Sequence, residues 1–179
     1  MIKICEEAHP IKLTSKLSEI YAAAFAQPPY KKTLRESEAF AVGYEEITRR
    51  TAFKLVVARD DQKPVGFAFG YHLRPEYGWY RVLGPILTQA GHSKWLEDAF
   101  CLAEMAVLPN YWGKSIGGRL HDELLQGLRS PHFLLSTMHS NETNAIHMYR
   151  GRGWKVLLDH IWVSEVDRKY MVLGKTADS

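Results

Sequence analysis

Residues 104–120 read EMAVLPNYWGKSIGGRL, and they decide the fold. An apolar strand predicted over Ala99–Val107 stops before Pro109, and an amphipathic helix predicted over Gly113–Leu128 follows at once. The first amides of a helix lack partners within the helix, and the helix dipole is positive there, so an anion fits beside them. Small side chains let a pyrophosphate approach the backbone; they belong to Gly113, Ser115, Gly117 and Gly118.

This turn favours phosphate binding, and an ordinary strand-to-helix connection with structural glycines is the alternative. A Walker A motif would require a glycine at position 108, which is occupied by Leu108. A dinucleotide-binding fingerprint would require G-x-G-x-x-G in an opening βαβ unit, and the sequence has neither. Both common phosphate-binding motifs are therefore excluded.

The turn resembles the acetyl-CoA signature of the GNAT superfamily of acetyltransferases, [QR]-x-x-G-x-[GA] after a strand ending L-x-V-x-P. Met105–Pro109 is similar to that strand end, and Trp112–Gly117 is similar to the signature core. Trp112 stands where Gln or Arg is usual, and Ser115 stands where the first glycine is usual. The resemblance implies that acetyl-CoA is the cosubstrate. It places acetyl-CoA on Met105, Ala106, Val107, Trp112, Gly113, Lys114, Ser115, Ile116, Gly117 and Gly118.

A second stretch, residues 141–154, reads NETNAIHMYRGRGW and is similar to the superfamily segment N-x-x-A-x-x-x-Y-x-x-x-G-F. Ala145, Tyr149 and Gly153 have the family spacing, and Trp154 stands where Phe is usual. In the family, this helix follows a strand that splays from its neighbour and opens a slot for the pantetheine arm. The resemblance implies that Tyr149 lies near the CoA sulfur, as part of the cofactor site and as the general acid. A core tyrosine on the helix face shared with Ala145 is the alternative.

Acetyl transfer to an amine requires a neutral nucleophile, a polarised thioester carbonyl and a proton for the departing thiolate. The resemblance implies direct attack without an acyl-enzyme, with the Val107 amide donating to the carbonyl. Glu104, in the strand before the turn, is the candidate general base; a solvated glutamate or a partner of Arg119 is the alternative. Asn144 either binds the pantetheine arm or caps its own helix, as asparagine does well. Two further candidate proton carriers, with a structural role as the alternative for each, are His139 and His147.

The rest of the chain predicts an α/β fold. Hydrophobic periodicity indicates helices over 14–26, 34–50 and 143–152, and strands over 2–5, 53–57, 65–71, 133–137, 154–158 and 169–173. This order suits a mixed sheet with helices on both faces, and the resemblance implies a GNAT-type, mostly antiparallel central sheet. Glycines and prolines break any regular pattern between Leu73 and Leu96, so the sequence leaves the conformation of this stretch open; a loop of that length is usually functional or mobile.

Two aromatic segments are candidates for the acceptor site. One is Phe25–Tyr30, between the first two helices, and the other holds Tyr71, Tyr77, Trp79 and Tyr80. Aromatic faces attract a cationic amine, and they are equally ordinary material for a core or a dimer interface. A small-molecule amine is slightly favoured over a peptide amine, because a chain of 179 residues has little surface beyond a core domain.

Composition predicts one globular domain over residues 1–179, with 46% hydrophobic and 24% charged residues. A net charge of +3 without a dense basic run argues against nucleic-acid binding, and Lys31–Lys32 is expected to be a solvated loop. Cys5 and Cys101 form no CxxC pair, so we expect two buried thiols, a reducing cytoplasm and no metal site.

No apolar run approaches the about 18 residues of a membrane helix, so no membrane partner is expected. Homodimers are common in the superfamily, which makes a homodimer one expectation. Two rival functions remain open. One is a catalytically inert, CoA-binding regulatory module of the same fold, and the other is a nucleic-acid-binding protein that uses the basic pI of about 8.8.

Overall fold

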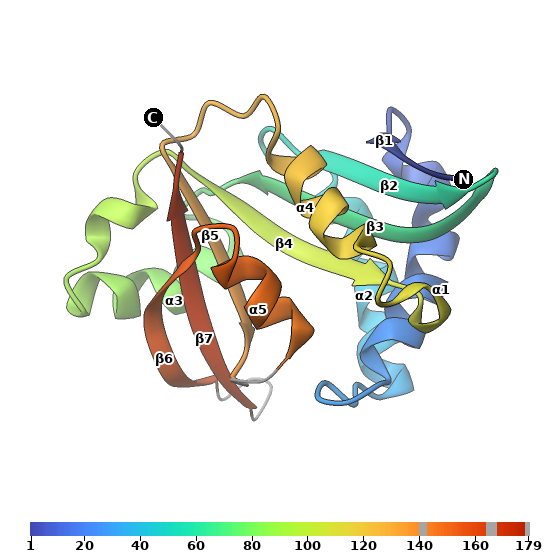
Figure 1. Ribbon diagram of the computed structural model, residues 1–179. Helices are drawn as coiled ribbons and strands as arrows, with labels where there is room; N and C mark the ends of the chain where they lie inside the picture. The colour runs from blue at the N-terminus through green and yellow to red at the C-terminus, as the bar shows by residue number, and fades with distance from the viewer. Residues whose placement is uncertain (140–142, 164–167, 178–179) are drawn as a thin grey trace. The chain divides into compact units, whose positions relative to one another are not determined.

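The computed structural model describes residues 1–139, 143–163 and 168–177. Seven strands form one sheet in the order β1-β2-β3-β4-β5-β7-β6, shown in Figure 1. Four of the neighbouring strand pairs are antiparallel, whereas β4 and β5 pair in parallel. The predicted mixed, mostly antiparallel α/β fold is therefore confirmed.

Contacts divide the chain into two compact units that alternate along the sequence. Unit 1 is residues 1–71 and 103–128, and unit 2 is residues 72–102 and 129–179. Strand β4 (Ala99–Val107) contributes its first four residues to unit 2 and its last five to unit 1. The expectation of a single domain over the chain stays a prediction.

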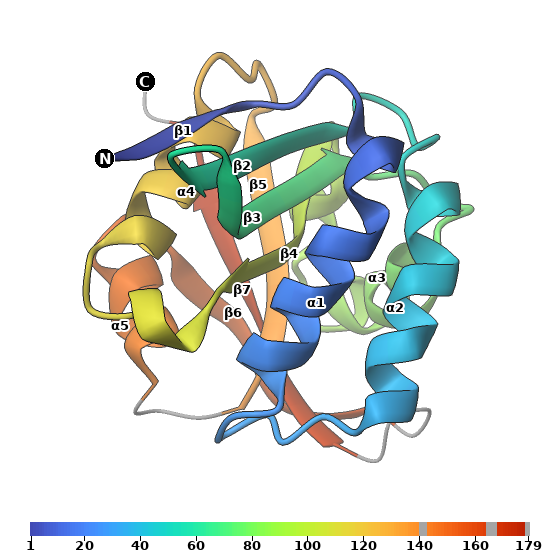
Figure 2. The ribbon, with the colours of Figure 1, turned by 90° about the vertical axis from the view of Figure 1, so that its right-hand side faces the viewer.

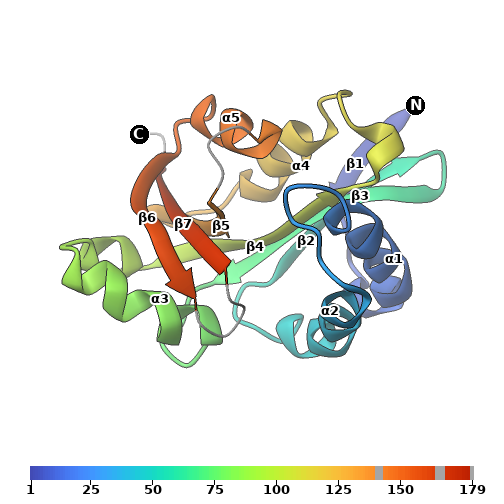
Figure 3. The same ribbon diagram turned by 90° about the horizontal axis from the view of Figure 1, so that it is seen from below.

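Unit 1 is a strand meander with helices on both faces. Its strands are β1 (Ile2–Glu6), β2 (Lys54–Asp60) and β3 (Lys63–His72, of which His72 belongs to unit 2), followed by the end of β4. Helices α1 (Thr14–Phe25) and α2 (Leu34–Ile47) cover one face, and α4 (Ile116–Leu125) covers the other, as Figures 2 and 3 show. Helix α2 begins with the capping box of Thr33 and Glu36 that its sequence contains.

Alternation along the strands explains both layers of unit 1. Leu55, Val57, Phe67 and Phe69 point into the core with α1 and α2. Gly66 points the other way, where an added Cβ would lie 3.2 Å from Leu120 of α4. Helix α4 is also fixed at its C-terminal end, because the Lys54 ammonium donates to the carbonyls of Glu123 and Gln126 at 3.0 and 2.9 Å.

Unit 2 is built around β7. Strand β7 (Arg168–Thr176) lies between β5 (His132–Met138) and β6 (Lys155–Val163), antiparallel to both. The start of β4 adds to β5 in parallel through Ala99–Cys101. Helices α3 (Gly78–Gln89) and α5 (Asn144–Arg150) lie on opposite sides of these strands (Figure 3).

The conformation of residues 73–96, which the sequence leaves open, is half helical, because α3 occupies Gly78–Gln89. Leu83 and Leu87 are buried one turn apart, which supplies the packing that favours a helix despite Pro85. Gly84 makes room for the ring of Tyr80, which an added Cβ would approach to 2.9 Å. A short 3₁₀ segment, Ser93–Leu96, follows the helix.

Two expectations need correction. Helix α4 begins at Ile116 and not at Gly113, because Gly113 and Ser115 have φ of +76° and +56°, outside the helical region. Cys5 is exposed and only Cys101 is buried, because β1 is the outer strand of the sheet. Among the residues described, no helix has the length and apolarity needed to cross a membrane.

Candidate active site

The turn between β4 and α4 has a backbone shaped for close approach of a ligand. After β4, the segment Pro109–Tyr111 forms a 3₁₀ turn, and Gly113 and Ser115 then take left-handed conformations. Ser115 precedes the first helical residue, and its side chain caps none of the α4 amides that the structure describes. The turn therefore presents backbone donors of the kind that bind a pyrophosphate.

Burial separates the predicted cofactor residues of this turn and strand into three groups. Ile116, Gly118 and Ala106 are buried, so they can offer a ligand only backbone groups. Gly113, Lys114 and Ser115 are exposed, and the remaining predicted residues of this turn and strand are half-buried or, for Trp112, exposed.

Trp112 folds back onto the end of β4. Its indole Nε1 donates to the carbonyl oxygen of Val107 at 2.7 Å, and 47% of the residue remains exposed. Trp112, the unusual residue of the signature, is therefore hydrogen-bonded to the end of β4. The amide of Val107 at this strand end is the predicted donor to the thioester.

Lys114 and its neighbours line a cavity of about 550 Å³. The Lys114 ammonium lies 4.7 Å from the ring centre of Tyr111, whose hydroxyl donates to Asp60 at 3.1 Å. That hydrogen bond to Asp60 raises the pKa of Tyr111. The cavity is lined by Ala23, Asp60, Lys63, Leu108, Pro109, Asn110, Tyr111 and Lys114.

Glu104 is a half-buried carboxylate in β4. Burial raises its pKa, and the positive charge of Lys32 partly offsets that rise. Arg119, the alternative partner of Glu104, instead donates to the carbonyl of Ile2 at 3.1 Å. A carboxylate whose pKa is raised toward neutrality is suited to proton transfer at physiological pH.

Lys32 is a candidate site residue that the sequence analysis did not single out, and the expectation that it is solvated is wrong. Lys32 is half-buried, it bonds the hydroxyl of Tyr21, and its ammonium lies 4.6 and 4.5 Å from the ring centres of Tyr21 and Phe25. Tyr21 in turn stacks on Phe40 at 4.2 Å. The predicted acceptor segment Phe25–Tyr30 thus belongs to a cluster that holds an ammonium group on aromatic faces.

The second predicted motif lies in unit 2. Tyr149 is 6% exposed on α5 and meets the ring of Trp154 edge-on at 5.8 Å. Thr143, and not Asn144, caps this helix, because the Thr143 side chain accepts from the Ile146 amide at 3.3 Å. Asn144 is exposed and remains a predicted pantetheine ligand. Residues 141 and 142 of the motif lie outside the described residues.

The other predicted candidates have packing partners or are exposed. The Trp79 indole donates to the hydroxyl of Ser136 at 3.0 Å, and the Arg50 guanidinium lies 4.5 Å from the ring centre of Tyr71. His147 is exposed on α5, whereas His139 hydrogen-bonds the carboxylate of Asp159.

Comparison with known protein families shows which family the chain belongs to. A model described as the acetyltransferase (GNAT) family matches residues 15–154, which include both predicted motifs. The chain belongs to this family. GNAT members are acetyltransferases that use acetyl-CoA, so the resemblance noted in the sequence is confirmed.

Individual relatives of this GNAT chain are distant. The GCN5-like protein acetyltransferase Rv2170 of Mycobacterium tuberculosis is 25% identical over 146 residues, 78% of this chain and 71% of the relative. The ribosomal-protein-S18-alanine N-acetyltransferase of Escherichia coli superposes with a TM-score of 0.64 at 16% identity, covering 100% of this chain and 96% of that one. The PaiA N-acetyltransferase of Thermoplasma acidophilum, solved with coenzyme A, has a TM-score of 0.63 at 13% identity and covers 99% of each chain. These two structures show the shared fold.

Proposed function

We propose that this GNAT chain transfers the acetyl group of acetyl-CoA to a primary amine by direct attack. The observation that carries the proposal is the half-buried Glu104, whose pKa is raised by burial and lowered in part by Lys32, in the unit that also contains the β4–α4 turn. Glu104 would supply the proton acceptor that this chemistry requires, the β4–α4 turn has a backbone shaped for a pyrophosphate, and the aromatic cluster around Lys32 can hold an ammonium group.

Each residue has a defined role in the proposal. Acetyl-CoA supplies the activated acetyl group as a thioester. The turn from Trp112 to Ser115, in which Gly113 and Ser115 are left-handed, and the first α4 amides hold its pyrophosphate, and the Val107 amide polarises the carbonyl. Glu104 accepts a proton from the incoming ammonium, so that the amine attacks in its neutral form. Tyr149 donates a proton to the departing CoA thiolate.

The aromatic cluster around Lys32 supports an alkylammonium as the acceptor. Tyr21 and Phe25 already hold one such group, the Lys32 side chain, at cation–π distance. A small-molecule amine stays slightly favoured, and a peptide amine is the competing acceptor, since the names of the relatives include a protein acetyltransferase. A panel of both acceptor classes separates the two.

Calorimetry with acetyl-CoA on the wild type and on Gly117→Glu tests the cofactor site first. The proposal expects micromolar binding to the wild type and its loss in the variant, whose carboxylate repels the pyrophosphate. Release of free thiol with an amine panel then tests turnover, with Tyr149→Phe as the matched variant. A wild type that fails to bind acetyl-CoA would overturn the proposal.

The catalytically inert module is the second candidate, and the Trp112 contact favours it. The Trp112 indole donates a hydrogen bond to the carbonyl oxygen of Val107. This carbonyl lies at the strand end that the acetyl group is predicted to approach. This candidate expects tight acetyl-CoA binding without thiol release for any amine. Trp112→Gln, which restores the usual signature residue, would leave such a module inert.

A further inference from the structure

Strand β6 carries an irregularity that places two polar residues side by side. Leu158 pairs with Val172 and Ile161 pairs with Tyr170, so Asp159 and His160 of β6 oppose a single residue of β7. His160 has φ of +55°, a left-handed conformation uncommon for a residue other than glycine. Bulges of this kind re-aim side chains, and they are over-represented beside functional sites.

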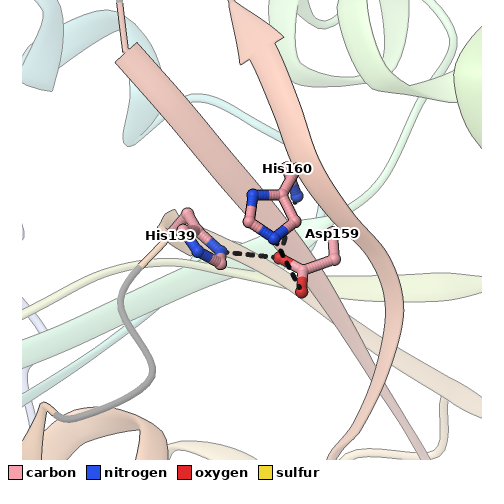
Figure 4. Close-up of side chains that lie close together, drawn as sticks. All are labelled: His139, Asp159 and His160. Carbon is pink, nitrogen blue, oxygen red and sulfur yellow. Dashed lines mark hydrogen bonds and ion pairs between the residues drawn. The ribbon is translucent and has the colours of Figure 1, made fainter.

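The neighbouring strand brings a third polar residue to the same place. His139 follows directly after β5, and its amide donates to the carbonyl of Lys169 in β7 at 2.9 Å. Because β7 lies between β5 and β6, His139 reaches the bulge across the end of β7. Figure 4 shows the two imidazoles and the carboxylate turned toward one another.

The distances within this cluster are short. His139 Nδ1 lies 2.7 Å from Asp159 Oδ1, and His160 Nε2 lies 3.8 Å from Asp159 Oδ2. The two imidazole centres are 3.8 Å apart, and one potential ligand atom from each residue lies within 4.8 Å of the others. The His160 amide also donates to Asp159 Oδ1 at 2.8 Å, which holds the carboxylate in place.

We propose that His139, Asp159 and His160 form a binding site for a zinc-like divalent transition metal ion. Two imidazoles and one carboxylate are a ligand set that such ions favour. Bonds of about 2.0–2.2 Å to one tetrahedral ion place ligand atoms about 3.3–3.6 Å apart, and the ligand atoms of the cluster already lie within 4.8 Å of one another. His160 and Asp159 are 59% and 40% exposed, which leaves a path for the ion and room for water as a further ligand.

The ion would link the end of β5 to the β6–β7 hairpin within unit 2. The proposal revises the expectation of no metal, which considered only cysteine pairs. It is independent of the acetyl-transfer proposal, because no residue of the cluster has a role there.

Metal titration of the full-length, tag-free chain tests the site. Zn²⁺ is added in competition with a chromophoric chelator, and Co²⁺ is added while its visible absorption is recorded. We expect one equivalent per chain with a Kd of about 10 µM or tighter, and a Co²⁺ spectrum typical of nitrogen and oxygen ligands. Zn²⁺ should also raise the melting temperature, because it binds the folded state.

The variants His139→Asn, Asp159→Asn and His160→Asn should each weaken Zn²⁺ binding at least about tenfold. His9→Asn, an exposed histidine of unit 1, is the matched control and should bind like the wild type. Amide shifts of the wild type on adding Zn²⁺, confined to the end of β5 and the bulge of β6, give a readout that requires no variant.

Wild-type protein without measurable Zn²⁺ or Co²⁺ uptake would overturn the proposal, as would full uptake by a His139→Asn/His160→Asn double variant. In either case the cluster is a hydrogen-bonded His–Asp pair that only orients the His139 ring.

Discussion

Glu104 is the residue whose environment most directly predicts an activity profile. Because burial raises its pKa, the ionised base forms only as the pH rises through that raised value. We expect Glu104→Gln to lower kcat by about 10²–10⁴-fold and to abolish the acidic limb of the pH–rate profile. An unchanged kcat in this variant would assign the proton transfer to another group.

The same carboxylate should make stability depend on pH. A raised folded-state pKa means that folding favours protonated Glu104, so its contribution to stability is present at low pH and lost as the pH rises through the folded value. We therefore expect Glu104→Gln to match the wild type under acidic conditions and to exceed its free energy of unfolding at neutral pH. Urea unfolding at several pH values measures this difference.

Lys32 affects the pH at which Glu104 loses its proton. Its positive charge lowers the pKa of Glu104, so Lys32→Met should raise this pKa and move the acidic limb of the pH–rate profile to higher pH. Lys32→Arg keeps the charge and should keep the limb close to the wild-type position. Equal pH profiles for Lys32→Met and the wild type would show that Lys32 does not act on the base.

At the scale of elements, the start of α4 depends on a left-handed residue. Ser115 has φ of +56°, which costs a non-glycine residue roughly 1–2 kcal/mol. Ser115→Gly restores the residue usual in the signature and should stabilise the chain by up to about 1 kcal/mol with acetyl-CoA binding retained. Ser115→Val should destabilise it by a similar amount and weaken binding, as thermal unfolding and calorimetry would show.

Thr143 gives α5 a comparable local test. Its side chain caps the Ile146 amide, so Thr143→Ala should cost about 1 kcal/mol, whereas Thr143→Ser should be close to neutral. Because Tyr149 lies on this helix, Thr143→Ala should also reduce thiol release if Tyr149 is the general acid. Thermal melts and thiol-release rates for the two variants check both expectations.

The sequence predicted the elements whose signals are local. The strand of residues 99–107 and the helix that became α2 are predicted because alternation and helical periodicity involve neighbouring positions. Helix α3 was missed because Gly84 and Pro85 interrupt its pattern, while the burial of Leu83 and Leu87 that favours it is a tertiary effect.

In the candidate site, too, the contiguous parts are predictable from the sequence, whereas contacts between distant residues are not. The β4–α4 turn was predicted because its signature is contiguous, but Lys32 lies far from Glu104 in sequence and only packing brings it near. The His139 cluster joins positions that are 20 residues apart. One signal was present, since the adjacent polar pair Asp159–His160 breaks the apolar run of the last part of β6, as a bulge does.

At the scale of the whole molecule, β4 makes the two units share a strand. We therefore expect one cooperative unfolding transition, although each unit has its own core. Trp112 is the tryptophan of unit 1, and the other four lie in unit 2, so the fluorescence of a Trp112→Phe variant reports unit 2 alone. Its urea midpoint should coincide with that from far-UV circular dichroism. Separate midpoints would mean that the units unfold independently.

The interleaving of the units also has a consequence for biosynthesis. Unit 1 opens the chain, but its last piece, residues 103–128, is made only after residues 72–102 of unit 2. A long N-terminal segment therefore leaves the ribosome before β4 and α4 have been made. Its apolar strands cannot yet pack against these two elements. The turn proposed to hold acetyl-CoA belongs to that last piece, so a nascent chain gains its cofactor site only when unit 1 can close. Chains terminated before Gly118 would lack a complete cofactor turn, and chains terminated before Leu128 would lack the end of unit 1.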